Sequence, residues 1–232
     1  MPRGLHRIAI TVVLLLSILA ACSPSQPCDM SSVYGEIANE RRAQYLKGVI
    51  ANDPSDAGAR LELAAIYLRE LIFTDSIAEL VSLTQQASVD PRSFQLLWLA
   101  YTKQPQPDYE KARMTLEAGL RALPGQFDLM ALLALHYCKF GRKLDCITAS
   151  RNALPHALNR RDKATLYLLL ATAETENSDE HYGRAVALDP SVASATETDI
   201  APRVYIGEIP VFHFKSHPET CARIRRLQQQ LG

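Results

Sequence analysis

The stretch FDLMALLALHYCKFGRKLDCITASRNA, residues 127–153, decides the fold. It falls into two amphipathic segments, residues 126–140 and 143–153, with apolar residues recurring at helical spacing. Gly141 lies between the segments, and glycine permits the positive φ that a tight turn requires. The stretch therefore predicts an antiparallel hairpin of two helices.

Similar pairs of segments lie on both sides of this hairpin. Proline disfavours helix in the residue before it and is tolerated in a first helical turn, so X-Pro pairs mark helix junctions. The junctions are Asp53-Pro54, Asp90-Pro91, Leu123-Pro124 and Asp189-Pro190. The helix pairs predicted between them are 57–70 with 74–87, 92–103 with 108–122, 126–140 with 143–153, and 159–176 with 179–188. Residues 31–51 are expected to form an unpaired helix packed on the first pair.

The spacing of these pairs resembles the tetratricopeptide repeat (TPR), a 34-residue helical hairpin. Tyr67 and Tyr101 lie 34 residues apart, as do Ala78 and Ala112. The third hairpin carries the family pattern best, at Met130, Leu133, Ala134, Tyr137, Gly141, Cys146 and Ala153. The resemblance implies an all-α fold, a short α-solenoid of antiparallel hairpins. An irregular helical solenoid or bundle is the alternative, and it is also all-α.

The N-terminus reads as a secretory leader. Arg3 and Arg7 precede a short apolar core and a small-residue exit, and the core is shorter than the roughly 20 residues of a membrane span. Residues 19–22, LAAC, resemble the bacterial lipobox, which implies cleavage before Cys22 and acylation of Cys22. An ordinary secretory signal is the alternative. Ser23, where an aspartate favours inner-membrane retention, makes the outer membrane, facing the periplasm, the expected location.

The chain is therefore expected to comprise four parts: a lipoprotein signal peptide (1–21), a tether (22–30), a TPR-like repeat domain (31–190) and a C-terminal cap segment (191–232). In the cap segment, β-branched and aromatic residues predict a partly extended stretch at 201–214. A final helix is predicted at 218–231. This segment either caps the solenoid or folds back into its groove.

Composition excludes a nucleic-acid partner. The full chain has 25 Lys+Arg and 25 Asp+Glu, and removal of the leader takes away only Arg3 and Arg7. The mature chain then has no basic surplus to bind phosphate backbones or anionic lipid. The full chain is sparse in glycine, with ten residues in all, and that composition suits helices.

The sequence shows no phosphate loop, nucleophile elbow or zinc-protease motif, so we expect neither an enzyme nor a cofactor. His136 is expected to be a packed side chain, and His181 a solvated residue at a helix start. His213, His217 and Cys221 recur every four residues, but Pro218 interrupts that helix and no fourth ligand is evident. No metal site is predicted.

Four cysteines follow Cys22, and an oxidising compartment would permit two disulfides among three connectivities. Cys138 and Cys146 lie on opposite arms of the third hairpin, almost symmetric about the turn. Cys28 and Cys221 would then join the two chain ends. The alternative for Cys138 and Cys146 is a pair of small buried thiols.

The resemblance also implies a concave groove lined by the first helix of each hairpin. The residues at lining positions include Leu61, Leu68, Arg92, Gln95, Leu99, Asp128 and Leu135. A Leu/Ala stripe with polar residues at its rim suits an amphipathic helix or an apolar peptide. The alternative is that the leucines belong to the core.

The expected function is that of a membrane-anchored periplasmic adaptor or assembly factor, binding a protein partner for a pilus, secretion or outer-membrane machine. This expectation rests on likeness of fold, which does not fix a role. An envelope enzyme subunit and a self-assembling structural lipoprotein are the alternatives.

Overall fold

The computed structural model describes residues 30–86, 88–194, 205–206 and 209–210. The chain divides into two compact units, residues 1–42 with 215–232 and residues 43–214. No helix within the described ranges is long and apolar enough to cross a membrane. The leader, Cys22, the tether, Cys28, Cys221 and the helix expected at 218–231 lie outside the described residues.

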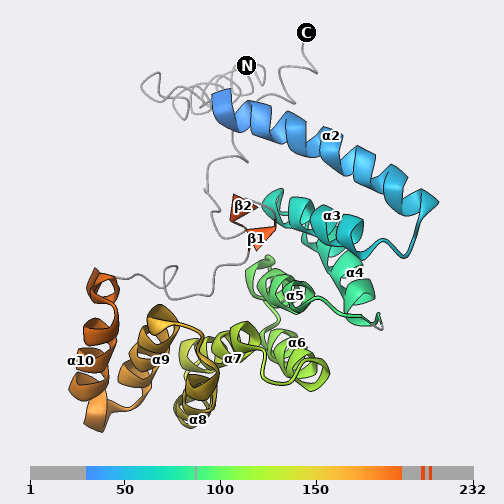
Figure 1. Ribbon diagram of the computed structural model, residues 1–232. Coiled ribbons are helices and arrows are strands. Elements are labelled where there is room, and N and C mark those ends of the chain that lie inside the picture. The colour runs from blue at the N-terminus through green and yellow to red at the C-terminus, as the bar shows by residue number, and fades with distance from the viewer. Residues whose placement is uncertain (1–29, 87, 195–204, 207–208, 211–232) are drawn as a thin grey trace, which may run out of the picture. The chain divides into compact units, whose positions relative to one another are not determined.

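Four helical hairpins follow one another in the second unit, as the sequence predicts (Figure 1). They are α3 (Ala57–Arg69) with α4 (Phe73–Thr84), α5 (Pro91–Lys103) with α6 (Tyr109–Ala122), α7 (Phe127–Lys139) with α8 (Lys143–Ala153), and α9 (Arg160–Ala173) with α10 (Ser178–Leu188). Short 3₁₀ turns, η1 (Leu154–His156), η2 (Thr175–Asn177) and η3 (Pro190–Ser194), lie beside the last two hairpins.

Several of the helices begin at a side-chain cap. Asp56, Asp90, Asp108 and Asn159 each accept a hydrogen bond from a backbone N–H in the first turn of α3, α5, α6 and α9. These caps satisfy donors that have no partner inside the helix. Pro91 occupies the first turn of α5, where its missing N–H is tolerated. The Asp-Pro junction at residues 90–91 is therefore a helix start.

The first helices of the hairpins form an inner layer. α3 contacts α5, α5 contacts α7 and α7 contacts α9, while α4, α6 and α8 lie on the outer side (Figure 1). One buried cluster runs continuously from α3 to α9 and includes Leu80, Leu96 and Leu132. A smaller cluster joins α9, α10 and Val192 of η3. The all-α solenoid of TPR-like hairpins is thus the observed fold.

The helix α2 (Met30–Asn52) crosses the boundary between the two units. Within the second unit, Ala43 and Leu46 are buried against Leu63 and Tyr67 of α3. The expected unpaired helix therefore packs on the first hairpin through its C-terminal half.

In the C-terminal segment, the described residues 205–206 and 209–210 are extended. Two short strands, β1 (Tyr205–Ile206) and β2 (Ile209–Pro210), pair antiparallel, with Tyr205 opposite Pro210. This pair lies within residues 201–214, where the sequence predicts the extended stretch.

Candidate functional site

The predicted groove is not an open apolar surface. Leu61, Leu68, Leu99 and Leu135 are all buried within the continuous core cluster. In the described structure these four leucines therefore belong to the core, which is the alternative interpretation of their spacing. Helical periodicity reports that a side chain is buried, but it does not say whether a partner or the protein itself buries it.

The polar members of the predicted set have a different environment. Gln95 of α5 is buried, and Asp128 of α7 is only partly buried. Burial raises the pKa of Asp128, and the nearby Gln95 side chain opposes that rise. The structure thus brings together two of the predicted residues from neighbouring inner helices, α5 and α7.

Arg92 lies near the start of α5 and is exposed. Its guanidinium pairs with Asp90, with Nε 2.9 Å from Oδ2 and Nη2 2.5 Å from the same oxygen. An exposed ion pair of this kind contributes little to the stability of the fold. The Arg92 guanidinium remains at the surface. Arg92, Gln95 and Asp128 are therefore the predicted groove residues that remain as polar features, and we call them the inner polar set.

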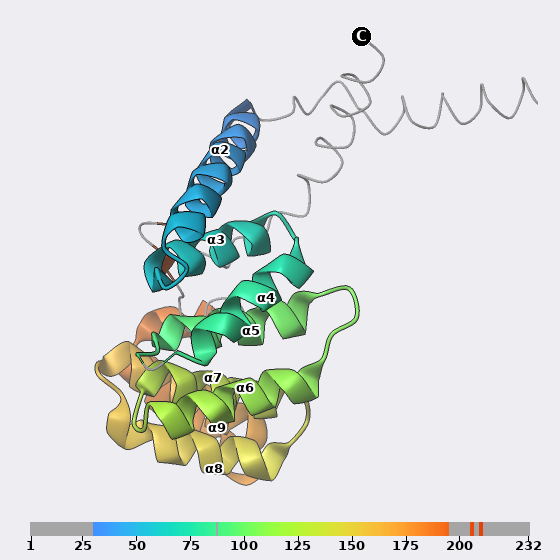
Figure 2. The same cartoon turned by 90° about the vertical axis from the view of Figure 1, so that its right-hand side faces the viewer.

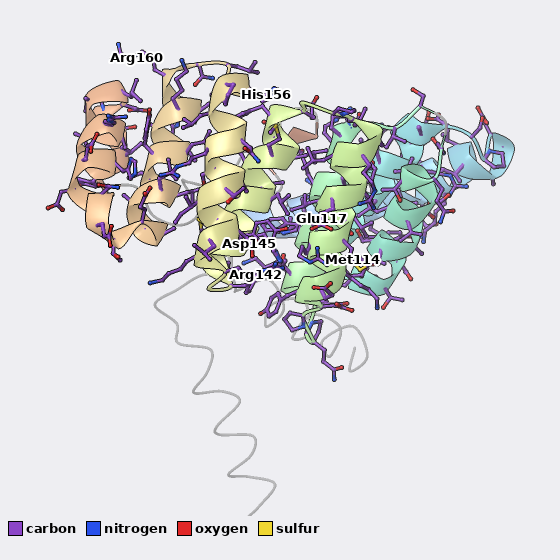
Figure 3. All side chains as sticks on the ribbon, turned by 90° about the horizontal axis from the view of Figure 1, so that it is seen from below. Met114, Glu117, Arg142, Asp145, His156 and Arg160 are labelled. Carbon is purple, nitrogen blue, oxygen red and sulfur yellow. A yellow bond between two sulfur atoms is a disulfide. The ribbon has the colours of Figure 1, made fainter. Side chains whose placement is uncertain are left out.

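A second polar group lies on the outer side, around Glu117 of α6. Glu117 pairs with Arg113, and the Tyr137 hydroxyl donates to Glu117 Oε1 at 3.0 Å. The guanidinium of Arg142 lies 4.8 Å from the centre of the Tyr137 ring, and Arg142 Nε donates to Asp145 at 2.7 Å. Figure 3 shows Glu117 on α6 and the Arg142–Asp145 pair at one end of α8. These contacts tie three consecutive helices together.

His136 is packed, as the sequence predicts, and it accepts a hydrogen bond. The indole Nε1 of Trp98 donates to His136 Nδ1 at 3.2 Å, and this contact joins α5 to α7 inside the protein. Burial and the nearby Arg113 and Arg142 lower the pKa of His136 to about 4. The ring is therefore neutral at pH 7 and has a structural partner.

His181 is not solvated, which corrects the sequence-based expectation. It is buried on α10, and its Nε2 lies 2.9 Å from Glu174. Arg151 of α8 also binds Glu174, at 2.8 and 2.9 Å. The hydrogen bond from His181 is the main cause of the lowered pKa of Glu174. The expectation failed because the acidic run around His181 looked solvated, while its partner Glu174 lies in the preceding helix–helix junction.

The structure joins Cys138 and Cys146 in a disulfide, with their Cα atoms 4.9 Å apart. Both sulfurs lie close to the carbonyl oxygen of Leu169 in α9, at 4.0 and 3.8 Å. The disulfide therefore links the two arms of the third hairpin where they meet the fourth.

The described part of the chain shows no metal-binding cluster. There, no three His, Cys, Asp or Glu side chains come together in a way that could hold a metal ion. The segment with His213, His217 and Cys221 lies outside the described residues.

Comparison with solved structures of MamA supports the fold. No protein-family model matches the chain, and no curated protein matches it either. Two crystal structures of MamA are similar: one with TM-score 0.53 and 16% identity, over 66% of this chain and 90% of that chain, and the other with TM-score 0.54 and 16% identity, over 71% and 89%. A thermophilic TPR protein of Thermus thermophilus has TM-score 0.49 and 17% identity, over 69% and 88%.

At these identities the likeness shows the fold alone. The chain is a TPR-like hairpin array, and such arrays present extended surfaces of the kind used to bind other proteins.

Proposed function

We propose that this chain is a lipid-anchored TPR-like adaptor that binds a protein partner at the bacterial envelope. Its role would be to assemble a pilus, secretion or outer-membrane machine. The observation that supports binding of a protein partner is the array of hairpins. Stacked hairpins each add a part of one extended surface.

The envelope location is supported by two independent features. Residues 19–22 resemble a lipobox ending at Cys22, and Ser23 follows it. Cys138 and Cys146 are joined in a disulfide, and disulfides persist mainly in oxidising compartments such as the periplasm. Several acyl chains on Cys22 would hold the protein stably at a membrane surface.

A binding rather than a catalytic role is supported by how the protein uses its chemically reactive groups. The His136 ring accepts a hydrogen bond from Trp98, and His181 binds Glu174. Each of these contacts connects two helices, so each group already has a structural task.

The inner polar set is the proposed contact for the partner. Arg92 offers an exposed charge, and Asp128 offers a half-buried carboxylate near Gln95. A partner with complementary polar groups suits this surface better than the apolar peptide that the sequence suggests. Leu99→Asp would not test binding, because Leu99 is 1% exposed and a charge there would disrupt the core.

Site-specific photocrosslinking in intact cells tests the partner contact. A photoreactive amino acid would replace Arg92 or Arg161, both exposed at the starts of inner helices, or Thr148 on the outer side as the control. We expect one discrete adduct from positions 92 and 161 that is absent from position 148 and is weakened by Asp128→Asn. The same adducts from all three positions, or none from any, would contradict the proposal.

Membrane anchoring is tested separately with Cys22→Ala. Wild-type protein is expected in the membrane fraction and to stay there in high salt, whereas the variant is expected to be released or to remain unprocessed. A variant that fractionates and migrates as the wild type does would refute the lipid anchor.

A further inference from the structure

The turns inside the first three hairpins lie along one edge of the second unit, which we call the turn edge. The α3–α4, α5–α6 and α7–α8 turns are all on the right-hand side in Figure 2. Each is closed by the same backbone contact, an N–H that donates to the carbonyl of a tyrosine. The pairs are Ile72 to Tyr67 at 2.8 Å, Asp108 to Tyr101 at 2.9 Å and Arg142 to Tyr137 at 2.9 Å.

Exposed apolar side chains gather on this edge. Leu71 and Ile72 are 38% and 43% exposed in the first turn, Tyr109 is 44% exposed after the second, and Leu144 is 80% exposed after the third. They are half of the large apolar side chains that are exposed in the described ranges. Scattered single exposures are ordinary, but a row along one edge indicates a contact surface.

The backbone conformation of the first turn does not favour a leucine at position 71. Leu71 has φ of 61°, the only positive φ of a non-glycine residue in the described structure. Gly141 adopts φ of 75° in the equivalent third turn, where glycine does so without strain. A leucine at this position therefore carries a conformational cost while leaving its side chain exposed, and such strain is often retained for function.

The two ends of the turn edge carry opposite charge. Around the first turn, Glu70 and Asp75 outnumber Arg69. Around the third turn, Lys139, Arg142 and Lys143 outnumber Asp145, which pairs with Arg142. An edge with an acidic end and a basic end, each carrying exposed apolar side chains, is complementary to itself when a second copy is rotated by half a turn.

We propose that the turn edge binds a second copy of this chain in a two-fold symmetric dimer. The acidic first turn of one copy faces the basic third turn of the other, with the Tyr109 turns near the two-fold axis. This inference does not depend on the proposed partner contact. The inner polar set lies near the starts of α5 and α7, whereas the turn edge is formed at the ends of these helices. Failure of the dimer would leave the adaptor proposal intact.

Sedimentation equilibrium of the full-length protein in detergent, corrected for bound detergent, tests the dimer. The first pair of variants reverses one end each: Glu70→Lys with Asp75→Lys, and Lys139→Glu with Lys143→Glu. We expect each to raise the dimer dissociation constant at least ~10-fold, or about 1.4 kcal/mol. Combining all four substitutions should return it to within ~3-fold of wild type. Circular dichroism would check that each variant is folded.

Leu144→Ser with Leu158→Ser as its control tests the apolar part. Leu158 is 83% exposed but lies beyond α8 in the loop before α9, away from the turn edge. We expect only Leu144→Ser to weaken the dimer. A wild-type protein that stays monomeric at all concentrations, charge reversals that fail to restore one another, or equal effects of the two leucine variants would overturn the proposal.

Discussion

At the scale of single residues, a few positions carry a residue that differs in size from those at the equivalent positions of the other hairpins. Each difference has a measurable consequence. Leu71 occupies a turn position that Gly141 fills in the third hairpin. Trp98 is bulky where neighbouring hairpins have the alanines Ala64 and Ala134, and its indole N–H is satisfied by His136. A buried indole without such an acceptor would be destabilising.

Leu71→Gly is expected to stabilise the protein by about 0.5–1 kcal/mol. Glycine removes the strain of the left-handed conformation, and the gain is partly offset by the freedom of glycine in the unfolded chain. Urea unfolding measures the change. Gly141→Ala is the matched control, because nothing lies within 4 Å of its added Cβ, so only backbone strain should destabilise it. Opposite signs for the two variants are expected, and equal signs would contradict the argument.

His136 makes stability depend on pH. The folded state keeps His136 neutral down to about pH 4, whereas the unfolded chain takes up a proton near pH 6.5. The contribution of His136 to the free energy of unfolding is complete above about pH 6.5 and is lost as the pH falls toward 4. The loss amounts to about 3 kcal/mol at most. Unfolding free energies of wild type and His136→Gln across this range isolate the effect. A wild-type minus variant difference that stays constant with pH would exclude it.

At the scale of helices, close approach between hairpins depends on small residues. Gly119 of α6 is the clearest case, because an added Cβ would lie 2.8 Å from Phe94 Cγ and 2.9 Å from Leu129 Cδ1. Both neighbours are buried and belong to the core. The α5–α6 and α6–α7 contacts thus require glycine at this position.

Gly119→Ala is accordingly expected to destabilise the protein by about 1–3 kcal/mol, the usual cost of overpacking a core. Gly183→Ala in α10 is the control, since nothing lies within 4 Å of its added Cβ. That variant should be neutral or stabilising by up to about 1 kcal/mol, because alanine favours helix over glycine. Thermal unfolding of both proteins would show whether the clash or the helix propensity decides the sign.

The Cys138–Cys146 disulfide closes a short loop within the third hairpin, with a sequence separation of 8. Loop-closure entropy predicts that it stabilises the fold by about 2–3 kcal/mol. Urea unfolding with and without reductant should show this loss for wild type. Cys138→Ser combined with Cys146→Ala should unfold like the reduced wild type in both conditions. If reductant changes the variant as much as it changes wild type, the effect comes from elsewhere.

At the scale of the molecule, local sequence signals were enough to predict the hairpins. Asp-Pro and Leu-Pro junctions, apolar spacing and Gly141 act within one hairpin, so they could be found without the structure. The helices begin and end close to the expected residues, apart from earlier ends for α4 at Thr84 and for α9 at Ala173.

The groove could not be predicted in the same way. Leu99 has the same periodic spacing whether a peptide or the neighbouring helices cover it, and the core cluster settles that it is internal. The Trp98–His136 and Arg151–Glu174 contacts join residues far apart in sequence, so no local pattern announces them. The bulk of Leu71 and Ile72 in a turn was the one available signal for the turn edge.

The most direct test of the account is mass spectrometry of the protein extracted from its native envelope without reductant. The account predicts an N-terminal peptide that begins at Cys22 and carries acyl chains, together with linked peptides containing Cys138 and Cys146. An unmodified peptide that runs through Cys22 from the preceding residues, with Cys138 and Cys146 as free thiols, would contradict it.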